Sequence, residues 1–371
     1  MKPLKETADC ALFVVDGNDD RDSHSLEKSA YQAIQTAATI NSMHPDGLSL
    51  FDRHGNDRGF VEPKFAGGRP VLEDLWIMQG SICDLRCRHC YTASSPSSNR
   101  LEQITSAELR PHLEAAATFG VQKICFTGGE VFVNEDVLQG RAERNDEFLS
   151  SLRLALEIAP VEILTNGRRY IRNHFDALRD LQGRFPGRLT LRITLESPVE
   201  AEHDAIRGRT TFGQTVETVR ELCSIGFVPV ITAERPLLHE HTSEAIRQSY
   251  VALFPAMKIE VNLIENMLEM GHQLVTMTAK GQRPTPEVFI TTKCFDILNR
   301  APESLMCHFS RCIQKIDGRL RYYPCPVIYD DERFDLGGTL EASFRRVYVA
   351  HKNCYDYCMK GGGASCRTHL I

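Results

Sequence analysis

Three cysteines lie close together in the sequence CDLRCRHC, at positions 83, 87 and 90. Clustered cysteines in a chain that is not secreted more often bind metal than form disulfides. Three thiolates at this spacing can bind three irons of a [4Fe–4S] cluster and leave the fourth iron open to a substrate or cosubstrate. The alternative is zinc with His89 as the fourth ligand, although His89 and Cys90 would then have to converge on one small tetrahedron. These residues favour the iron cluster and leave zinc open.

Six further cysteines gather in the last quarter of the chain, and they are Cys307, Cys312, Cys325, Cys354, Cys358 and Cys366. Apolar residues on both sides of Asp317-Gly318 predict a β-hairpin with Cys325 at its end. Glycines between Cys358 and Cys366 let the backbone fold closely around a ligand. The region therefore predicts a second metal site, and taken alone it favours a zinc ribbon.

Apolar runs and amphipathic stretches alternate through the middle of the chain, and these elements must position the first cysteine group. Strands are expected over 75–81, 121–129, 161–167, 189–197, 227–234 and 258–265. Helices are expected over 105–120, 145–159, 168–183, 212–226 and 241–254, the first of them capped by Thr105 or Ser106. Successive βα units of this kind form a full or partial barrel or an open parallel sheet. Active sites in such folds lie at the carboxyl ends of the strands, and the first cysteine group directly follows the first strand.

The composition excludes several classes of protein. A net charge of −6 over 371 residues argues against nucleic-acid binding, which normally requires a basic excess. No run of about 18 uncharged apolar residues is present, so no membrane span is expected. The first ten residues, MKPLKETADC, contain no apolar signal region, and we expect a cytoplasmic protein.

The central region resembles the radical S-adenosylmethionine (SAM) superfamily over residues 72 to 265. Cys83, Cys87 and Cys90 match the family's cysteine loop, with His89 in the usual aromatic position. GGE at 128–130, TNG at 165–167, TLES at 194–197 and EHDAIRG at 202–208 follow in the family's order, with Thr194 and Glu196 in place of the usual Ser-x-Asp. The resemblance implies SAM contacts from His89, Gly128, Gly129, Glu130, Asn166, Thr194, Glu196 and Arg207.

The resemblance also implies a cofactor and a reaction. SAM would chelate the open iron of a [4Fe–4S] cluster, and one electron would cleave its sulfonium to methionine and a 5′-deoxyadenosyl radical, which abstracts hydrogen from the substrate. Reducing a sulfonium requires a very low potential, which thiolate-ligated clusters can reach. An external electron donor such as flavodoxin or ferredoxin is implied as a partner.

The C-terminal region resembles the SPASM/twitch extension of radical SAM enzymes. Cys307, Cys312 and Cys325 match its opening, and this likeness implies one auxiliary [4Fe–4S] cluster whose fourth ligand is Cys354, Cys358 or Cys366. A second auxiliary cluster is not expected, because it would need fewer protein ligands or Cys294. The fold expected is therefore α/β, a partial (β/α)6 barrel over 72–270 followed by a small cysteine-rich domain over 271–371. Residues 1–71 are assigned no role.

The leading hypothesis is an enzyme that oxidises or rearranges a small molecule or a peptide by hydrogen abstraction. Polar residues at strand ends are the candidate catalytic groups, namely Glu234, Arg235 and Glu265. Three alternatives remain: a peptide maturase that forms a crosslink, SAM-dependent group transfer on the same barrel, and a zinc-stabilised binding protein.

Overall fold

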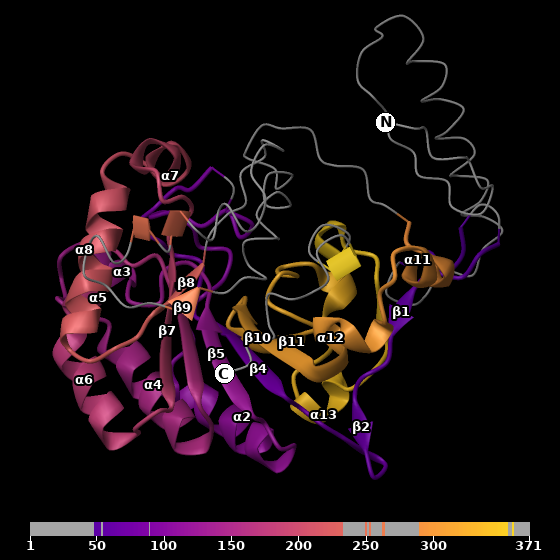
Figure 1. Ribbon diagram of the computed structural model, residues 1–371. Helices are drawn as coiled ribbons and strands as arrows, with labels where there is room; N and C mark the ends of the chain where they lie inside the picture. Colours follow the sequence, from indigo (N-terminus) through magenta and orange to yellow (C-terminus); the bar gives the residue numbers. More distant parts are fainter. Residues whose placement is uncertain are drawn as a thin grey trace, which may run out of the picture.

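The computed structural model describes residues 48–52, 55–88, 90–232, 249–250, 252–253, 262–263, 289–354 and 358–359. Within these ranges the chain forms an α/β fold built on one large, mostly parallel sheet, with helices covering one of its faces (Figure 1). The segment expected to form the helix over 241–254 lies mostly outside the described residues.

The sheet has eight strands in the order β11-β10-β4-β5-β6-β7-β8-β9. Their bounds are β4 (Asp74–Met78), β5 (Lys123–Thr127), β6 (Val161–Thr165), β7 (Leu189–Thr194), β8 (Val230–Thr232), β9 (Asn262–Leu263), β10 (Ser310–Ile316) and β11 (Arg319–Tyr323). Every neighbouring pair from β10 to β9 is parallel, and only β11 runs antiparallel. The six strands expected from the sequence are therefore confirmed, and the fold is the partial barrel that βα units predict.

The helices that follow the strands are α2 (Ser106–Thr118), α3 (Glu135–Leu138), α4 (Asp146–Ile158), α5 (Arg169–Arg172), α6 (Phe175–Arg184), α7 (Glu200–Arg207) and α8 (Thr211–Ser224). The start of α2 is fixed by a capping box, in which the Thr105 hydroxyl accepts from the Glu108 N–H and the Glu108 carboxylate accepts from the Thr105 N–H. The single helix expected over 168–183 is instead two, α5 and α6. The chain leaves the helix at His174, whose buried imidazole accepts a hydrogen bond from the Asn145 N–H at 3.0 Å.

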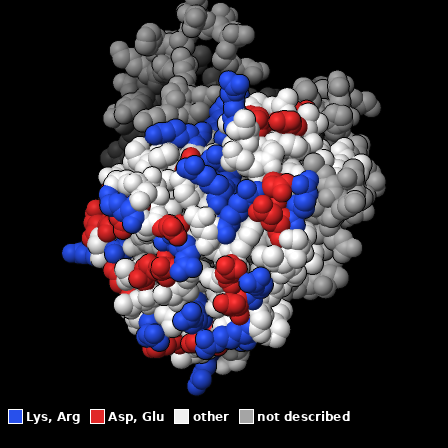
Figure 2. Space-filling view, turned by 90° about the vertical axis from the view of Figure 1, so that its left-hand side faces the viewer, with Lys and Arg blue, Asp and Glu red and all other residues white. Residues whose placement is uncertain are grey.

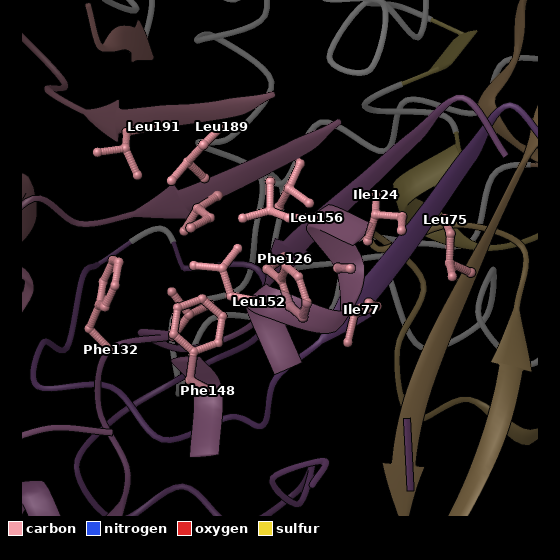
Figure 3. Close-up of a cluster of buried hydrophobic side chains, with 14 of the residues drawn as sticks. Leu75, Ile77, Ile124, Phe126, Phe132, Phe148, Leu152, Leu156, Leu189 and Leu191 are labelled. Carbon is pink, nitrogen blue, oxygen red and sulfur yellow. The ribbon is translucent and has the colours of Figure 1, made fainter. Parts of the chain in front are cut away.

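Alternation along the strands sends side chains to two different cores. Leu75 and Ile77 of β4 join the core between the sheet and the helices, where Phe148 and Leu152 of α4 pack (Figure 3). Trp76 and Met78 of the same strand belong to a second core on the other face of the sheet. That core also contains most of the C-terminal cysteines.

The hairpin expected around Asp317-Gly318 is formed by β10 and β11. Asp317 and Gly318 have φ angles of 49° and 71°, as a two-residue turn between twisted strands requires, and Gly318 adopts its angle without the steric cost of a side chain. β10 pairs in parallel with β4, with Cys312 opposite Trp76. The hairpin therefore extends the barrel sheet (Figure 1). The domain boundary at 270/271 stays a prediction.

Short elements surround the hairpin. They are β1 (Phe60–Val61), β2 (Phe65–Ala66), β3 (Arg69–Pro70), α11 (Thr292–Ile297), η2 (Pro302–Ser304), α12 (Met306–Phe309), η3 (Glu332–Phe334), α13 (Leu340–Ser343) and β12 (Val347–Tyr348). β1 pairs with β12, which joins the segment before the barrel to the segment after the hairpin.

The described surface carries both signs of charge. Lys, Arg, Asp and Glu are interspersed on the face shown in Figure 2, with basic side chains gathered in the upper part of the view. Among the helices in the described ranges, none is long and apolar enough to cross a bilayer.

Candidate active site

The first cysteine group lies on the loop that follows β4, at the carboxyl end of the sheet. Backbone hydrogen bonds attach this loop to the residues after β5: the Gly129 N–H donates to the Gly80 carbonyl at 2.9 Å, and the Glu130 N–H donates to the Ile82 carbonyl at 2.9 Å. Cys83 is buried, whereas Cys87 and Cys90 are half-buried. The loop is thus held against the end of β5 by its own backbone.

The two glycines at 128 and 129 are required by how closely the two backbone segments approach. A Cβ at Gly128 would lie 2.4 Å from the Gly80 carbonyl oxygen, and one at Gly129 would lie 2.0 Å from the Ile82 carbonyl oxygen. No side chain fits at such distances, because van der Waals contacts between carbon and oxygen need well over 3 Å. Gly128 also has a φ of 134°, which side chains rarely allow. The GGE motif therefore has a structural reason here beyond ligand contact.

Glu130 lies beneath the cysteine loop and is 2% exposed. The Thr165 hydroxyl and the Asn166 N–H donate to its two carboxylate oxygens, at 2.8 and 2.7 Å. Burial, together with the nearby Asp84 carboxylate, raises the pKa of Glu130 to about 7. A cation bound above this carboxylate would restore its ionised form.

Asp84 is a site residue that the motif comparison missed. Its carboxylate accepts from the Asn166 side-chain amide at 2.7 Å and from the Arg168 guanidinium at 2.9 Å. These bonds connect the cysteine loop to the end of β6. The sequence feature that could have indicated Asp84 is an acidic residue directly after the first cysteine, in a loop that must be held rigidly.

A buried ion pair lies on the other side of the cysteine loop. Arg207 donates to Glu196 at 3.1 Å, and the Glu196 N–H donates to His203 Nδ1 at 3.2 Å. Arg207 Nε and His203 Nε2 are buried without a hydrogen-bond partner among the described residues. The Arg207 cation lowers the pKa of Cys87, although burial is the larger effect and raises it to about 11. Thr194 is the last residue of β7, two residues before Glu196.

The three thiols fit a metal cluster as an electrostatic group. Cys87 contributes to the raised pKa of Cys83, and Cys90 contributes to the raised pKa of Cys87. Burial raises the pKa of the Cys83 thiol, with Asp84 as the next cause. Coordination to a metal reverses this penalty, because a coordinating thiol is deprotonated outright. Arg207 Nε and His203 Nε2 could each donate one further hydrogen bond.

The described C-terminal cysteines form a second group, and the ligand set expected for it stays a prediction. Cys307, Cys325, Cys354 and Cys358 line one apolar cavity with Leu305, Val327 and Val349 among its walls. Cys312 is not part of that lining: it packs in the core opposite Trp76, and the Gln314 amide donates to its sulfur at 3.9 Å. Cys312 nevertheless belongs to the same buried core as Cys325, Cys354 and Cys358.

Electrostatics connect Cys325 with all four of the other described C-terminal cysteines. Burial raises the pKa of Cys325 well above its ordinary value, and Cys358, Cys354, Cys307 and Cys312 are the next causes. Within the described ranges, no three Cys, His, Asp or Glu side chains converge tightly enough to bind a single metal ion. The case for a cluster at either cysteine group therefore rests on ligand chemistry and, for the second group, on the shared cavity.

A cavity of about 550 Å³ lies between the first cysteine loop and the C-terminal segment. Its lining is Cys90, Tyr91, Ala93, Arg100, Tyr329, Asp330, Asp331, Glu332, Arg333, His351 and Lys352. Arg100 pairs with Asp330 at 2.7 Å, and Arg333 pairs with Asp331 at 2.8 Å. The rings of Tyr91 and Tyr329 pack edge to face, 6.2 Å between centroids. The cavity is thus polar, with both signs of charge and two aromatic walls.

Several predicted residues lie outside the described residues. They are His89, Glu234, Arg235, Glu265 and Cys366. The other predicted SAM contacts, Gly128 to Glu130, Asn166, Glu196 and Arg207, lie around the cysteine loop at the carboxyl ends of β5 to β7.

Known proteins resemble the chain over its central region. Residues 78–252 match the model of the radical SAM superfamily. The antilisterial bacteriocin subtilosin biosynthesis protein AlbA of Bacillus subtilis is 28% identical over 145 residues, 39% of this chain and 29% of that protein. Molybdenum cofactor biosynthesis protein 1 of Bos taurus is 26% identical over 186 residues, 50% of this chain and 27% of that protein.

Among solved structures, Streptococcus suis SuiB bound to S-adenosylmethionine aligns with a TM-score of 0.47 and 14% identity, covering 72% of this chain and 63% of that chain. The chain spans less than a third of the length of the two curated relatives it matches. Radical SAM proteins are enzymes that use a [4Fe–4S] cluster and SAM, and residues 78–252 of this chain are similar to that superfamily.

Proposed function

We propose that this protein cleaves SAM reductively and uses the resulting 5′-deoxyadenosyl radical to abstract hydrogen from a substrate, with an auxiliary [4Fe–4S] cluster that assists oxidation or rearrangement. The observation that carries the proposal is the group of three cysteines on the loop after β4, next to a polar cavity that Cys90 lines. A second group of four cysteines lines a separate, apolar cavity.

Cys83, Cys87 and Cys90 are the proposed ligands of the SAM-binding cluster. Glu130 and Asn166 on one side, and Glu196 and Arg207 on the other, provide charged and hydrogen-bonding groups for a zwitterionic cosubstrate. The raised pKa of Glu130 supports a role for it beside a cationic group, because a buried carboxylate regains its charge most easily next to an ammonium. The cluster and SAM together supply the radical, and these residues bind and orient them.

Cys307, Cys325, Cys354 and Cys358 are the proposed ligands of the auxiliary cluster. Four thiols around one apolar cavity match the complete thiolate ligation that a [4Fe–4S] cluster takes when it only transfers electrons. This set replaces Cys312 with two of the later cysteines. With four protein ligands in place, electron transfer is the role we assign to it.

The cavity of about 550 Å³ is the proposed substrate site. Its volume is in the range of ordinary ligand pockets and suits a small molecule or a few residues of a peptide. Its charged lining favours a polar substrate. One relative is named for bacteriocin biosynthesis and another for molybdenum cofactor biosynthesis, so both a peptide and a small molecule remain candidates. We favour the small molecule, with peptide crosslinking as the alternative.

An external donor such as flavodoxin or ferredoxin would supply the electron, and we place the enzyme in the cytoplasm, where thiols stay reduced. The proposal is tested by anaerobic purification followed by reaction with SAM and dithionite. We expect brown protein with about eight irons per chain, and formation of methionine and 5′-deoxyadenosine. Colourless protein with stoichiometric zinc would overturn the proposal, and SAM consumption without 5′-deoxyadenosine would point to group transfer.

To identify the substrate, candidate molecules are first deuterated at carbons that do not exchange with solvent. They are then incubated with the reduced enzyme and SAM. Transfer of deuterium into 5′-deoxyadenosine marks the substrate and the position attacked. A variant that changes the cavity, Arg333→Gln, serves as the matched comparison, because it should weaken substrate binding while SAM cleavage in the absence of substrate continues.

A further inference from the structure

A smaller cavity shares a wall with the proposed substrate cavity and differs from it in charge. Its volume is about 180 Å³, and its lining is Leu48, Pro324, Arg333, Phe334, Leu336, Arg345, Arg346, Val347 and Tyr348. Among these described residues there are three arginines and no carboxylate, whereas both signs of charge line the cavity of about 550 Å³. We call the smaller one the arginine cavity. Arg333 lines both, so the two cavities lie on either side of this side chain.

Two of the three guanidinium groups already have an acidic partner. Arg333 pairs with Asp331 at 2.8 Å, and Arg346 pairs with Glu62 at 2.5 Å. Both of these carboxylates lie outside the lining of the arginine cavity. The two pairs therefore fix the directions of the arginines and leave the cavity itself lined by positive charge alone.

Arg345 is the arginine whose charge is not matched. It is exposed, lies between α13 and β12, and donates through Nη2 to the backbone carbonyl of Asp335. The Asp335 carboxylate is instead bonded to Arg321, at 2.7 Å. Among the described residues, no Asp or Glu side chain forms an ion pair with Arg345. Its guanidinium is therefore available to an anion from solution.

The remaining walls of the arginine cavity are apolar and buried. Phe334, Leu336 and Val347 are each no more than 5% exposed. A cleft with one sign of charge and walls of low dielectric concentrates the electrostatic potential and attracts counter-ions. The guanidinium group binds the oxygens of phosphate and carboxylate through two parallel hydrogen bonds. The charge and the donors of this cavity thus suit an oxyanion.

We propose that the arginine cavity is a subsite for an oxyanion, a phosphate or carboxylate group, and that the substrate carries it. The inference rests on the proposed function, because Arg333 separates this subsite from the cavity in which hydrogen abstraction is proposed. The substrate class is then an anionic molecule, with a polar body in the larger cavity and its oxyanion beside Arg345. A free oxyanion has the same chemistry, and the experiment below separates the two sources.

The test measures the binding of radiolabelled inorganic phosphate to the anaerobic holoenzyme by equilibrium dialysis at constant ionic strength. SAM is added at saturation to every sample, so that the cosubstrate site around Arg207 is occupied. We expect saturable binding at a single site in the wild type. In Arg345→Gln the Kd should rise at least about tenfold, which corresponds to about 1.4 kcal/mol. Arg345→Lys keeps the charge and should stay within about threefold of the wild type.

Arg319→Gln is the matched control for the loss of one positive charge. Arg319 is exposed on β11 and does not line the arginine cavity, so its Kd for phosphate should equal that of the wild type. Equal Kd values in the wild type and Arg345→Gln, or no saturable binding in the wild type, would overturn the subsite. Dialysis requires no SAM cleavage, so either result leaves the proposed reaction intact, and a failure of SAM cleavage does not affect the phosphate measurement.

Kinetics with the substrate found by deuterium transfer then identify the source of the oxyanion. If the substrate carries it, inorganic phosphate should raise the KM for the substrate and leave kcat unchanged, and this competition should weaken in Arg345→Gln. A change in kcat alone would mark the free ion as a separate ligand and would overturn the assignment to the substrate.

Discussion

Cys83, Cys87 and Cys90 share one loop, whereas the cysteines of the second cavity come from α12, the end of the hairpin and the segment after β12. The first group is assembled by local sequence and is fixed by its contacts with Gly129 and Glu130. The second is assembled only when β10 pairs with β4 and the last segment packs against it. A site with one open position can be built on a loop, while complete ligation requires several segments.

The two groups also differ in the charges around them. The loop has three carboxylates and two arginines within its hydrogen-bond network, at the edge of a polar cavity. The second group is surrounded by apolar side chains. The difference is consistent with the polar cosubstrate site and the electron-transfer site that we propose for the two groups.

The largest expected effect is a difference in SAM cleavage between a variant of the first cysteine group and a variant of the second. Cys87→Ala should reduce SAM cleavage to the level of a protein-free control, because the cluster loses one of its three ligands. Cys325→Ala should still form 5′-deoxyadenosine, while the substrate product is lost. Both are measured by chromatography of deoxyadenosine and product after dithionite reduction. Full product formation by Cys325→Ala would contradict an auxiliary role.

The iron content of variants tests which cysteines of the second group are ligands. Cys325→Ala should lose about half of the iron per chain, because four of about eight irons are held there. Cys312→Ala is the matched control and should keep all of it, since this thiol packs in the core beside Trp76. Iron is quantified colorimetrically after anaerobic purification. Loss of iron in Cys312→Ala but not in Cys358→Ala would restore the ligand set expected from the motif.

The rigidity of the first loop is tested at a glycine. Gly129→Ala would place a Cβ 2.0 Å from the Ile82 carbonyl oxygen and should destabilise the protein by more than about 3 kcal/mol. Gly213→Ala is the control: it lies on α8 with no atom within 4 Å of the added Cβ, and should stabilise by up to about 1 kcal/mol. Denaturant unfolding measures both. Equal stabilities would show that the loop is not docked as described.

The smallest expected effect is a pH dependence of the free energy of unfolding that comes from Glu130, next to the first cysteine group. The pKa of Glu130 is raised in the folded state from 4.5 to about 7, so the folded protein binds the proton more tightly than the unfolded chain. Its contribution to stability is complete below pH 4.5 and is lost as the pH rises through 7, on the order of 3 kcal/mol. Unfolding of the metal-free protein should show this dependence relative to Glu130→Gln, in which it disappears. If the stability of the wild type and that of Glu130→Gln changed with pH in the same way, the raised pKa of the buried Glu130 carboxylate would be contradicted.

Much of the fold followed from pattern because its signals are local. The six strands, the capped start of α2 and the turn at Asp317-Gly318 depend on residues that are neighbours in sequence. The break between α5 and α6 did not, because it depends on a contact between His174 and Asn145. For the same reason, Asp84 was missed: its importance lies in bonds to Asn166 and Arg168, which come from another strand.

The sequence by itself determined that the chain carries a three-cysteine loop at the end of the first strand, because three ligands and their spacing lie within eight residues. Tertiary structure decided which later cysteines meet. Strand pairing holds Cys312 opposite Trp76, while Cys354 and Cys358 are brought to Cys307 and Cys325 across the second core. Spacing along the chain cannot specify such a group, because its members are joined by packing between distant segments.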